Sequence, residues 1–151
     1  VPRTRGDEPA AAADSISRFL GVERRMSEVG RYNGAIVVDD YGHHPTEIRV
    51  TLDALRQKYQ PRRLICVFQP HQYSRTRRLL EDFGTSFGDA ELTIVPDIYA
   101  VRDSAEDRAA VSSSDLVERI QRSGRAALHM PGFPAVVDHL KTTARDGDVI
   151  V

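Results

Sequence analysis

Two short polar segments hold most of the side chains that could do chemistry. The first is Asp39-Asp40-Tyr41-Gly42-His43-His44-Pro45, and the second is Gln69-Pro70-His71-Gln72-Tyr73-Ser74-Arg75-Thr76-Arg77. A carboxylate such as that of Asp40 can accept hydrogen bonds from a ribose diol, and imidazoles can donate to phosphate or carboxylate oxygens. Arginine pairs bidentately with carboxylate or phosphate. The chemistry that these two segments favour is therefore the binding of hydroxyl groups and anions.

The first segment has two other interpretations. Asp39, Asp40, His43 and His44 are all metal-capable, but adjacent histidines point in different directions and no Cys pair or helical i, i+4 His pair accompanies them. We therefore expect no metal site here. In the plainer alternative, the aspartates cap or end an element of secondary structure, and the histidines are surface loop residues. The sequence also has neither a glycine-rich phosphate loop with its lysine nor a GxGxxG motif, so it would not hold the phosphates of a nucleotide by itself.

Each polar segment follows an apolar run and precedes a helical pattern. Residues 35–39 and 64–68 are predicted as buried strands because their apolar runs are continuous. Pro45 is expected to open a helix that extends to about Lys58, and Ser74 is a candidate N-cap for a second helix. The inward face of that second helix is expected to hold four apolar residues: Leu79, Leu80, Phe83 and Phe87.

The remaining elements follow from the same signals. Asn33-Gly34 predicts a hairpin between strands at about 25–31 and 35–39. Residues 96–114 form a polar segment without a predicted element. The other predicted strands are 92–95, 126–129 and 148–151, and the other predicted helices are 10–20, 115–123 and 134–144.

This alternation predicts the fold class: α/β, with a mostly parallel Rossmann-like sheet, helices on both faces and an antiparallel edge hairpin. In such sheets, ligands bind beyond the carboxyl ends of the strands. Both polar segments fall at predicted carboxyl ends of strands. We therefore expect their side chains to meet at one edge of the sheet.

Composition narrows the possible partners. The chain has 151 residues, 40% of them hydrophobic, and a formal net charge of −1, so we expect one domain and no nucleic-acid or membrane partner. The single cysteine, Cys66, lies in an apolar run, which predicts a core thiol and a cytoplasmic location. Because the sequence starts with Val and ends within an apparent strand, we expect a piece of a longer protein. Residues 1–9 are interpreted as a linker or added end.

The two polar segments resemble the C-terminal domain of the Mur ligases of peptidoglycan synthesis. The resemblance is carried by residues 39–48 and 68–77, and it is greatest for the alanine-adding branch of the family. Residues 21–26 and 29–30 resemble the family's junction with a preceding central ATPase domain. The resemblance covers about residues 10–151, which are identified as one Mur ligase C-terminal domain, truncated at its end and lacking the central domain.

The resemblance implies a reaction and its participants. The alanine-adding branch is an ATP-dependent amide-forming ligase that joins L-alanine to UDP-N-acetylmuramate through an acyl phosphate. ATP and Mg2+ serve the whole enzyme, with the metal and the phosphate loop in the central domain, on which this domain would dock. Alone, the fragment would hold no cofactor and show no turnover.

The resemblance also implies residue roles. Asp40 and Tyr41 would bind the nucleotide, at the ribose and against its face. His43 would be catalytic, at the reacting end. His71 and Arg75 would bind the carboxylate of L-alanine. Arg25 would belong to the domain junction, and Gln72 stands where the family commonly carries Arg.

Two rival functions are kept. One is a non-enzymatic α/β protein-binding module in which both polar segments contact a partner protein. The other is a related Mur ligase that uses another amino acid or a peptide as its substrate.

Overall fold

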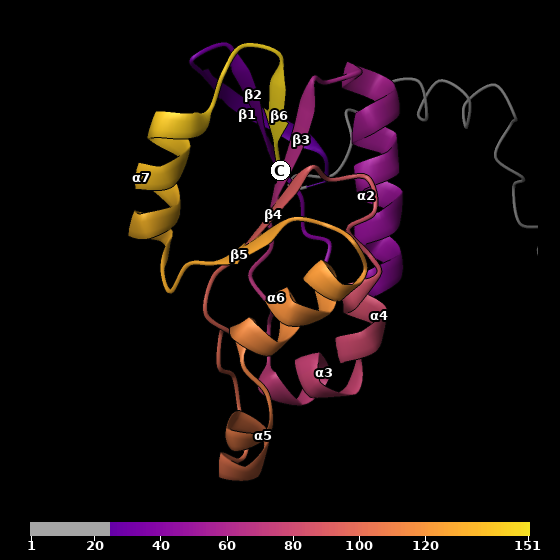
Figure 1. Ribbon diagram of the computed structural model, residues 1–151, viewed down its shortest axis with the longest axis vertical. Coiled ribbons are helices and arrows are strands. Elements are labelled where there is room, and N and C mark those ends of the chain that lie inside the picture. Colours follow the sequence, from indigo (N-terminus) through magenta and orange to yellow (C-terminus); the bar gives the residue numbers. More distant parts are fainter. Residues whose placement is uncertain (1–24) are drawn as a thin grey trace, which may run out of the picture.

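The computed structural model describes residues 25–151, which form one six-stranded sheet in the order β1-β2-β6-β3-β4-β5 (Figure 1). Only the β1–β2 pair is antiparallel among these neighbours; the other four pairs are parallel. The strands are β1 (Ser27–Tyr32), β2 (Ala35–Asp39), β3 (Arg63–Val67), β4 (Leu92–Val95), β5 (Ala127–His129) and β6 (Asp148–Ile150). The helices are α2 (Pro45–Tyr59), α3 (Tyr73–Arg78), α4 (Leu80–Gly84), α5 (Ala105–Ala110), α6 (Ser113–Arg122) and α7 (Phe133–Thr143). The predicted fold class is confirmed.

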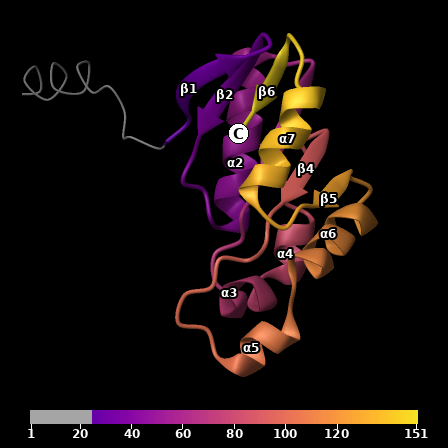
Figure 2. The same ribbon diagram turned by 90° about the vertical axis from the view of Figure 1, so that its left-hand side faces the viewer.

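The helices cover both faces of the sheet because the connections change direction. From β2 to β3, β4 and β5 the chain moves one way across the sheet, and right-handed crossovers place α2, α4 and α6 on the same face. The connection from β5 returns to β6, between β2 and β3, so α7 covers the opposite face (Figure 2). The helices α3 and α5 lie beyond the carboxyl ends of the strands, at the bottom of Figure 1.

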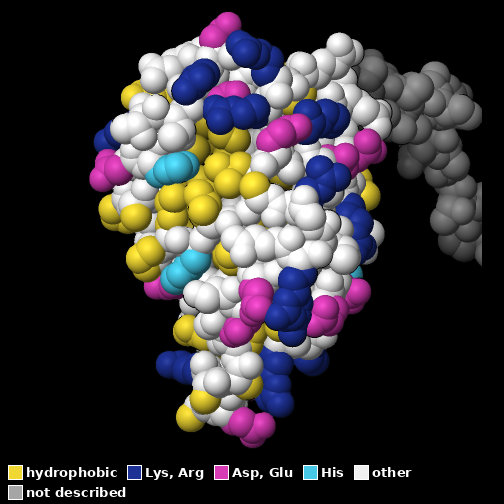
Figure 3. Space-filling view, viewed as in Figure 1, with side chains coloured by type: hydrophobic (Ala, Val, Ile, Leu, Met, Phe, Trp, Pro, Cys, Tyr) yellow, Lys and Arg dark blue, Asp and Glu magenta, His cyan; other side chains and the backbone are white. Residues whose placement is uncertain are grey.

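Two apolar clusters hold these layers together. The larger lies under α2, α4 and α6 and includes Leu52, Phe83, Leu116 and Ile120, each no more than 1% exposed. The smaller packs α7 on the sheet through Val136 and Ala144. Beside α7 the cover is incomplete, and hydrophobic side chains reach the surface between α7 and the β5 edge (Figure 3). The exposed apolar residues of these elements are Leu128, Phe133 and Val137.

Most local predictions are confirmed. Asn33 and Gly34 both adopt positive φ and join β1 to β2, as the Asn-Gly signal requires. A Cβ on Gly34 would overlap the backbone and side chain of Asp146, so the turn also needs glycine for space. Pro45 occupies the first turn of α2, which ends one residue beyond the predicted Lys58.

Three details of the predictions were wrong. The second helix begins inside the polar segment, at Tyr73, and breaks at Leu79 into α3 and α4, with Phe87 beyond both. Ser74 is not its N-cap; the cap position is Gln72, whose side chain makes no capping bond. The polar segment 96–114 contains the short helix α5 and the start of α6. The predicted segments 1–9 and 10–20 lie outside the described residues.

The last strand has an unexpected position. The segment predicted as 148–151 forms β6 between β2 and β3, hydrogen-bonded to both and buried. Nothing in its three-residue sequence specifies a central place in the sheet.

Among the described residues, no helix is both long and apolar enough to cross a bilayer.

Candidate functional site

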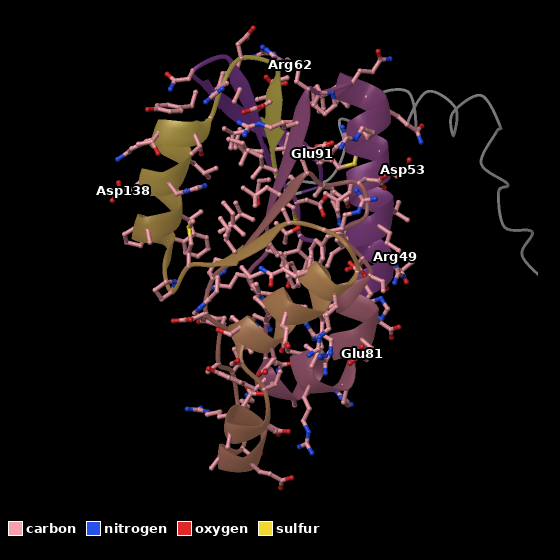
Figure 4. All side chains as sticks on the ribbon, in the orientation of Figure 1. Arg49, Asp53, Arg62, Glu81, Glu91 and Asp138 are labelled. Atoms are coloured by element: carbon pink, nitrogen blue, oxygen red, sulfur yellow. The ribbon has the colours of Figure 1, made fainter. Side chains whose placement is uncertain are left out.

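One cleft brings the predicted site residues together. Its volume is about 330 Å3, and it lies at the carboxyl edge of the sheet, opposite the edge that Arg62 marks in Figure 4. The lining residues come from three parts of the chain: Asp40, Tyr41, Gly42 and His43 after β2; Phe68, Gln69, His71 and Arg75 after β3; and Phe133 at the start of α7. All five residues given catalytic or ligand-binding roles by resemblance therefore line one cavity, whereas Arg25 does not. Their individual roles stay predictions.

Asp40 lines the cleft and is held by three hydrogen bonds. Its Oδ1 accepts hydrogen bonds from Gly42 N at 2.8 Å and Thr51 Oγ1 at 3.2 Å, and its Oδ2 accepts one from Met26 N at 2.9 Å. A carboxylate has about four acceptor positions, so one position on Oδ2 remains for a ligand hydroxyl. A Cβ on Gly42 would lie 2.9 Å from Oδ1, so any other residue at this position would displace the Asp40 carboxylate.

The turn that carries His43 is fixed by a capping box at the start of α2. His44 Nδ1 accepts a hydrogen bond from Thr46 N, and Glu47 accepts from the backbone N–H groups of both His43 and His44. These backbone bonds, His43's first, outweigh partial desolvation and hold the pKa of the Glu47 carboxyl below its ordinary value. His44 thus caps a helix, which is the plainer interpretation of that histidine.

His43 and Tyr41 form an aromatic side of the cleft. Their ring centroids lie 5.4 Å apart in an edge-to-face arrangement, and Tyr41 is more than half exposed. The Nδ1 of His43 lies 3.2 Å from the Tyr41 carbonyl and 3.4 Å from Glu47 Oε2. With Nδ1 directed to these oxygens, Nε2 is the nitrogen left for a ligand.

The second polar segment presents one uncommitted guanidinium. Arg77 pairs with Glu106 and Asp107 of α5, and Arg78 donates to the Ser74 carbonyl. Arg75 is half-buried in the cleft wall and, within residues 25–151, its side chain forms neither a hydrogen bond nor an ion pair. A partly desolvated guanidinium without a partner favours an anionic ligand.

Gln72 does not line the cleft. Its side-chain amide instead donates to the Val101 carbonyl at 3.5 Å, and its backbone adopts φ 75° and ψ 129°. The chain thus turns sharply between His71 and Arg75, in a conformation that costs a non-glycine residue of order 1–3 kcal/mol. Arg75 is therefore the remaining cation of this segment at the cleft.

Sequence reasoning missed two contributors to the site. Phe133, at the start of α7, lines the cleft although it is distant in sequence from both polar segments. An exposed aromatic residue at the start of a helix does not by itself indicate a ligand site in the sequence. The segment 97–103 contacts the second polar segment, and its Tyr99 ring stacks on His71 with centroids 5.4 Å apart. The available signal for this segment was its place after a buried strand, at the same carboxyl edge of the sheet as the two polar segments.

Cys66 takes no part in the cleft chemistry. Burial, with the nearby negative charge of Asp40, raises the pKa of its thiol to about 12, so it stays protonated in the core as predicted.

Arg25 is exposed before β1, and its charge helps lower the pKa of Glu47. Across residues 25–151, no three His, Cys, Asp or Glu side chains gather as a metal site.

The cleft fits part of a nucleotide better than the whole. Exposed aromatic rings and a carboxylate with one open acceptor position suit a base and its sugar, whereas the described residues offer no glycine-rich cradle for phosphates. The same residues do not fit a Mg2+ ion, because no ligand set is present among them.

Comparisons with known proteins identify the family of the chain. Residues 24–151 match the model of the Mur ligase, glutamate ligase domain, and the chain belongs to this family. The fold class is therefore that of a Mur ligase C-terminal domain. A curated relative is the UDP-N-acetylmuramate–L-alanine ligase of Caldanaerobacter subterraneus subsp. tengcongensis, 42% identical over 146 residues, covering 97% of this chain and 31% of the relative.

Two solved structures extend the similarity. The UDP-N-acetylmuramate-alanine ligase of Thermotoga maritima superposes with a TM-score of 0.71 at 19% identity, over 95% of this chain and 29% of that one, which supports the fold. The murein peptide ligase of Psychrobacter arcticus superposes with a TM-score of 0.68 at 25% identity, over 93% of this chain and 28% of that one. The chain spans about a third of the length of the curated relatives it matches.

Proposed function

We propose that this chain is the C-terminal domain of an ATP-dependent ligase that joins L-alanine to UDP-N-acetylmuramate. The observation that carries the proposal is the 42% identity over 97% of the chain to a curated ligase of that name. The cleft supports it, since it presents an unpaired guanidinium for a carboxylate and aromatic rings beside an acidic side chain for a nucleoside.

The residue roles follow from the chemistry at each place. Arg75, with His71 beside it, would bind the alanine carboxylate and hold the amine toward the reacting carbon. Asp40 would accept a ribose hydroxyl at its free position, with Tyr41 against the base. His43 would turn Nε2 to the reacting end, where it can donate to an oxygen or accept a proton from the amine.

The domain would act by closing on a central ATPase domain that carries the phosphate loop and Mg2+. Closure would exclude water from the acyl phosphate formed on the lactyl carboxylate, so that the alanine amine displaces phosphate and forms the amide. We place the reaction in the cytoplasm, where a free thiol such as that of Cys66 stays reduced.

A domain exchange tests the proposal. Residues 10–151 replace the aligned segment of the Caldanaerobacter ligase, and ADP release is measured with ATP and UDP-N-acetylmuramate, with and without L-alanine. We expect alanine-dependent ADP release that is absent when the segment is simply deleted. A chimera that unfolds cooperatively and binds UDP-N-acetylmuramate, yet releases no ADP with alanine, would contradict the proposal.

The alternative within the family is a ligase for a peptide, which the similarity to the murein peptide ligase supports. The same chimera is assayed with the tripeptide L-alanyl-γ-D-glutamyl-meso-diaminopimelate in place of L-alanine. Turnover with the tripeptide and none with alanine would favour this alternative. Turnover with alanine alone supports the proposal above.

A further inference from the structure

Three residues of the second polar segment are held by one loop. We call residues 97–103, which follow β4, the brace loop. The sequence patterns predict no function for this loop. Gln69 Nε2 donates to the Asp97 carbonyl at 3.2 Å, the His71 ring stacks on Tyr99, and Ser74 N donates to Asp103 Oδ1 at 3.0 Å. Gln69 and His71 line the cleft, and Ser74 precedes Arg75.

Backbone bonds continue the same attachment. Tyr99 N donates to the Pro70 carbonyl at 2.8 Å, and Gln72 N donates to the Tyr99 carbonyl at 2.9 Å, forming a parallel bridge between His71 and Tyr99. The strained backbone of Gln72 is thus held from outside its own segment. Because a conformation at positive φ persists only where its surroundings fix it, the brace loop keeps the turn between His71 and Arg75 in place.

Asp103 supplies the cap that α3 lacks. Gln72 occupies the N-cap position without a side-chain bond, and the Asp103 carboxylate accepts instead from Ser74 N and, at 3.0 Å, from Val101 N. Partial desolvation works to raise the pKa of the Asp103 carboxyl, but these backbone donors outweigh it and hold the pKa below the ordinary value. Asp103 therefore orders the first turn of α3, which carries Arg75.

We propose that Asp103 and Tyr99 of the brace loop are positioning residues that hold Arg75 and His71 in the geometry that binds the carboxylate of the amino-acid substrate. The inference rests on the proposed function, because it takes that carboxylate as the ligand of the cleft. Neither residue needs to touch the ligand: Asp103 acts through Ser74, and Tyr99 acts through the His71 ring.

The test uses the ligase chimera that carries residues 10–151. Asp103→Asn keeps the size of the side chain but turns one acceptor into a donor facing a backbone N–H. We expect the KM for alanine to rise about tenfold, with the KM for ATP unchanged and the melting temperature close to that of the parent. Glu106→Gln is the matched control: it removes an exposed carboxylate just beyond the brace loop and should leave the KM for alanine unchanged.

A second pair of variants addresses the stacked rings. Tyr99→Phe keeps the stack and should behave as the parent, whereas Tyr99→Ala should raise the KM for alanine about fivefold without changing that for ATP. An unchanged KM for alanine in both Asp103→Asn and Tyr99→Ala overturns the inference, as does an equal rise in both KM values. If the parent chimera shows no alanine-dependent turnover, the proposed function itself is contradicted. That outcome is distinct from the failure of the positioning roles, which appears only in the variants.

Discussion

The two polar segments at the cleft are fixed in different ways. The segment after β2 is stabilised mainly by neighbours in sequence: Asp40 bonds to Gly42, and Glu47 bonds to His43 and His44. The segment after β3 is stabilised by residues nearly thirty positions away, through Tyr99 and Asp103. The first side of the cleft can therefore form with its own helix, whereas the second needs a neighbouring strand and loop in place.

The difference also separates the energetic roles of the two sides. In the first segment the Asp40 carboxylate is hydrogen-bonded within the fold, so it contributes to stability as well as to the site. In the second, Arg75 is left without a partner in the described chain, and a backbone strain remains at Gln72. Groups that stay unsatisfied in the folded protein are commonly those reserved for a ligand. Substitutions on the two sides of the cleft test this contrast.

Asp40→Ala should destabilise the chain by about 3 kcal/mol, because three donors lose their acceptor. Urea unfolding followed by circular dichroism gives the free energy of unfolding. Asp53→Ala, on the exposed face of α2 in Figure 4, is the control and should change it little. If Asp40→Ala changes the free energy of unfolding by less than about 0.5 kcal/mol, Asp40 does not stabilise the fold.

Arg75→Ala should show the opposite balance. We expect the KM for alanine in the ligase chimera to rise about a hundredfold, since a bidentate pair with the carboxylate is lost. The free energy of unfolding should change by less than about 0.5 kcal/mol, as the side chain has no partner to lose. Arg78→Ala, a neighbouring exposed arginine, should alter neither quantity. Equal effects of the two arginine variants on the KM for alanine would show that alanine binding does not depend on Arg75 in particular.

Gln72 offers a measurement of strain. Gln72→Gly and Gln72→Ala both remove the bond to Val101, but only glycine adopts the observed φ without cost. The glycine variant should therefore be more stable than the alanine variant by about 1 kcal/mol, measured by the same urea titration. An alanine variant as stable as the glycine variant would mean that the turn relaxes to negative φ.

Acid should weaken the first segment through Glu47. Its pKa is lower in the folded chain than the ordinary 4.5, so the stabilisation is present above that value and is lost as pH falls through the folded pKa. The urea midpoint should fall as the pH drops from about 5 to about 3, and Glu47→Gln should reduce that fall. Asp103 and Asp148 also have lowered pKa values, so part of the acid sensitivity should remain in the variant.

Sequence patterns located the first side of the cleft better than the second. The Asn33-Gly34 turn and Pro45 at a helix start each act within a few residues, so they can be predicted locally. The capping role of Asp103 and the positive φ of Gln72 arise from contacts between distant segments, and no local pattern specifies them. The convergence of both polar segments was predicted because parallel strands end at one edge. Phe133 arrives by a separate crossover and was not.

The place of β6 has a consequence for how the chain is made. It is the last of the described strands to be synthesised, yet it lies between β2 and β3 and supplies the hydrogen bonds that join them. Until it arrives, a nascent chain has two separate sets of strands with open edges, which invite pairing with other chains. The two walls of the cleft therefore come together only once β6 has been synthesised, and a ribosome-bound chain that stops at α7 should be prone to aggregate.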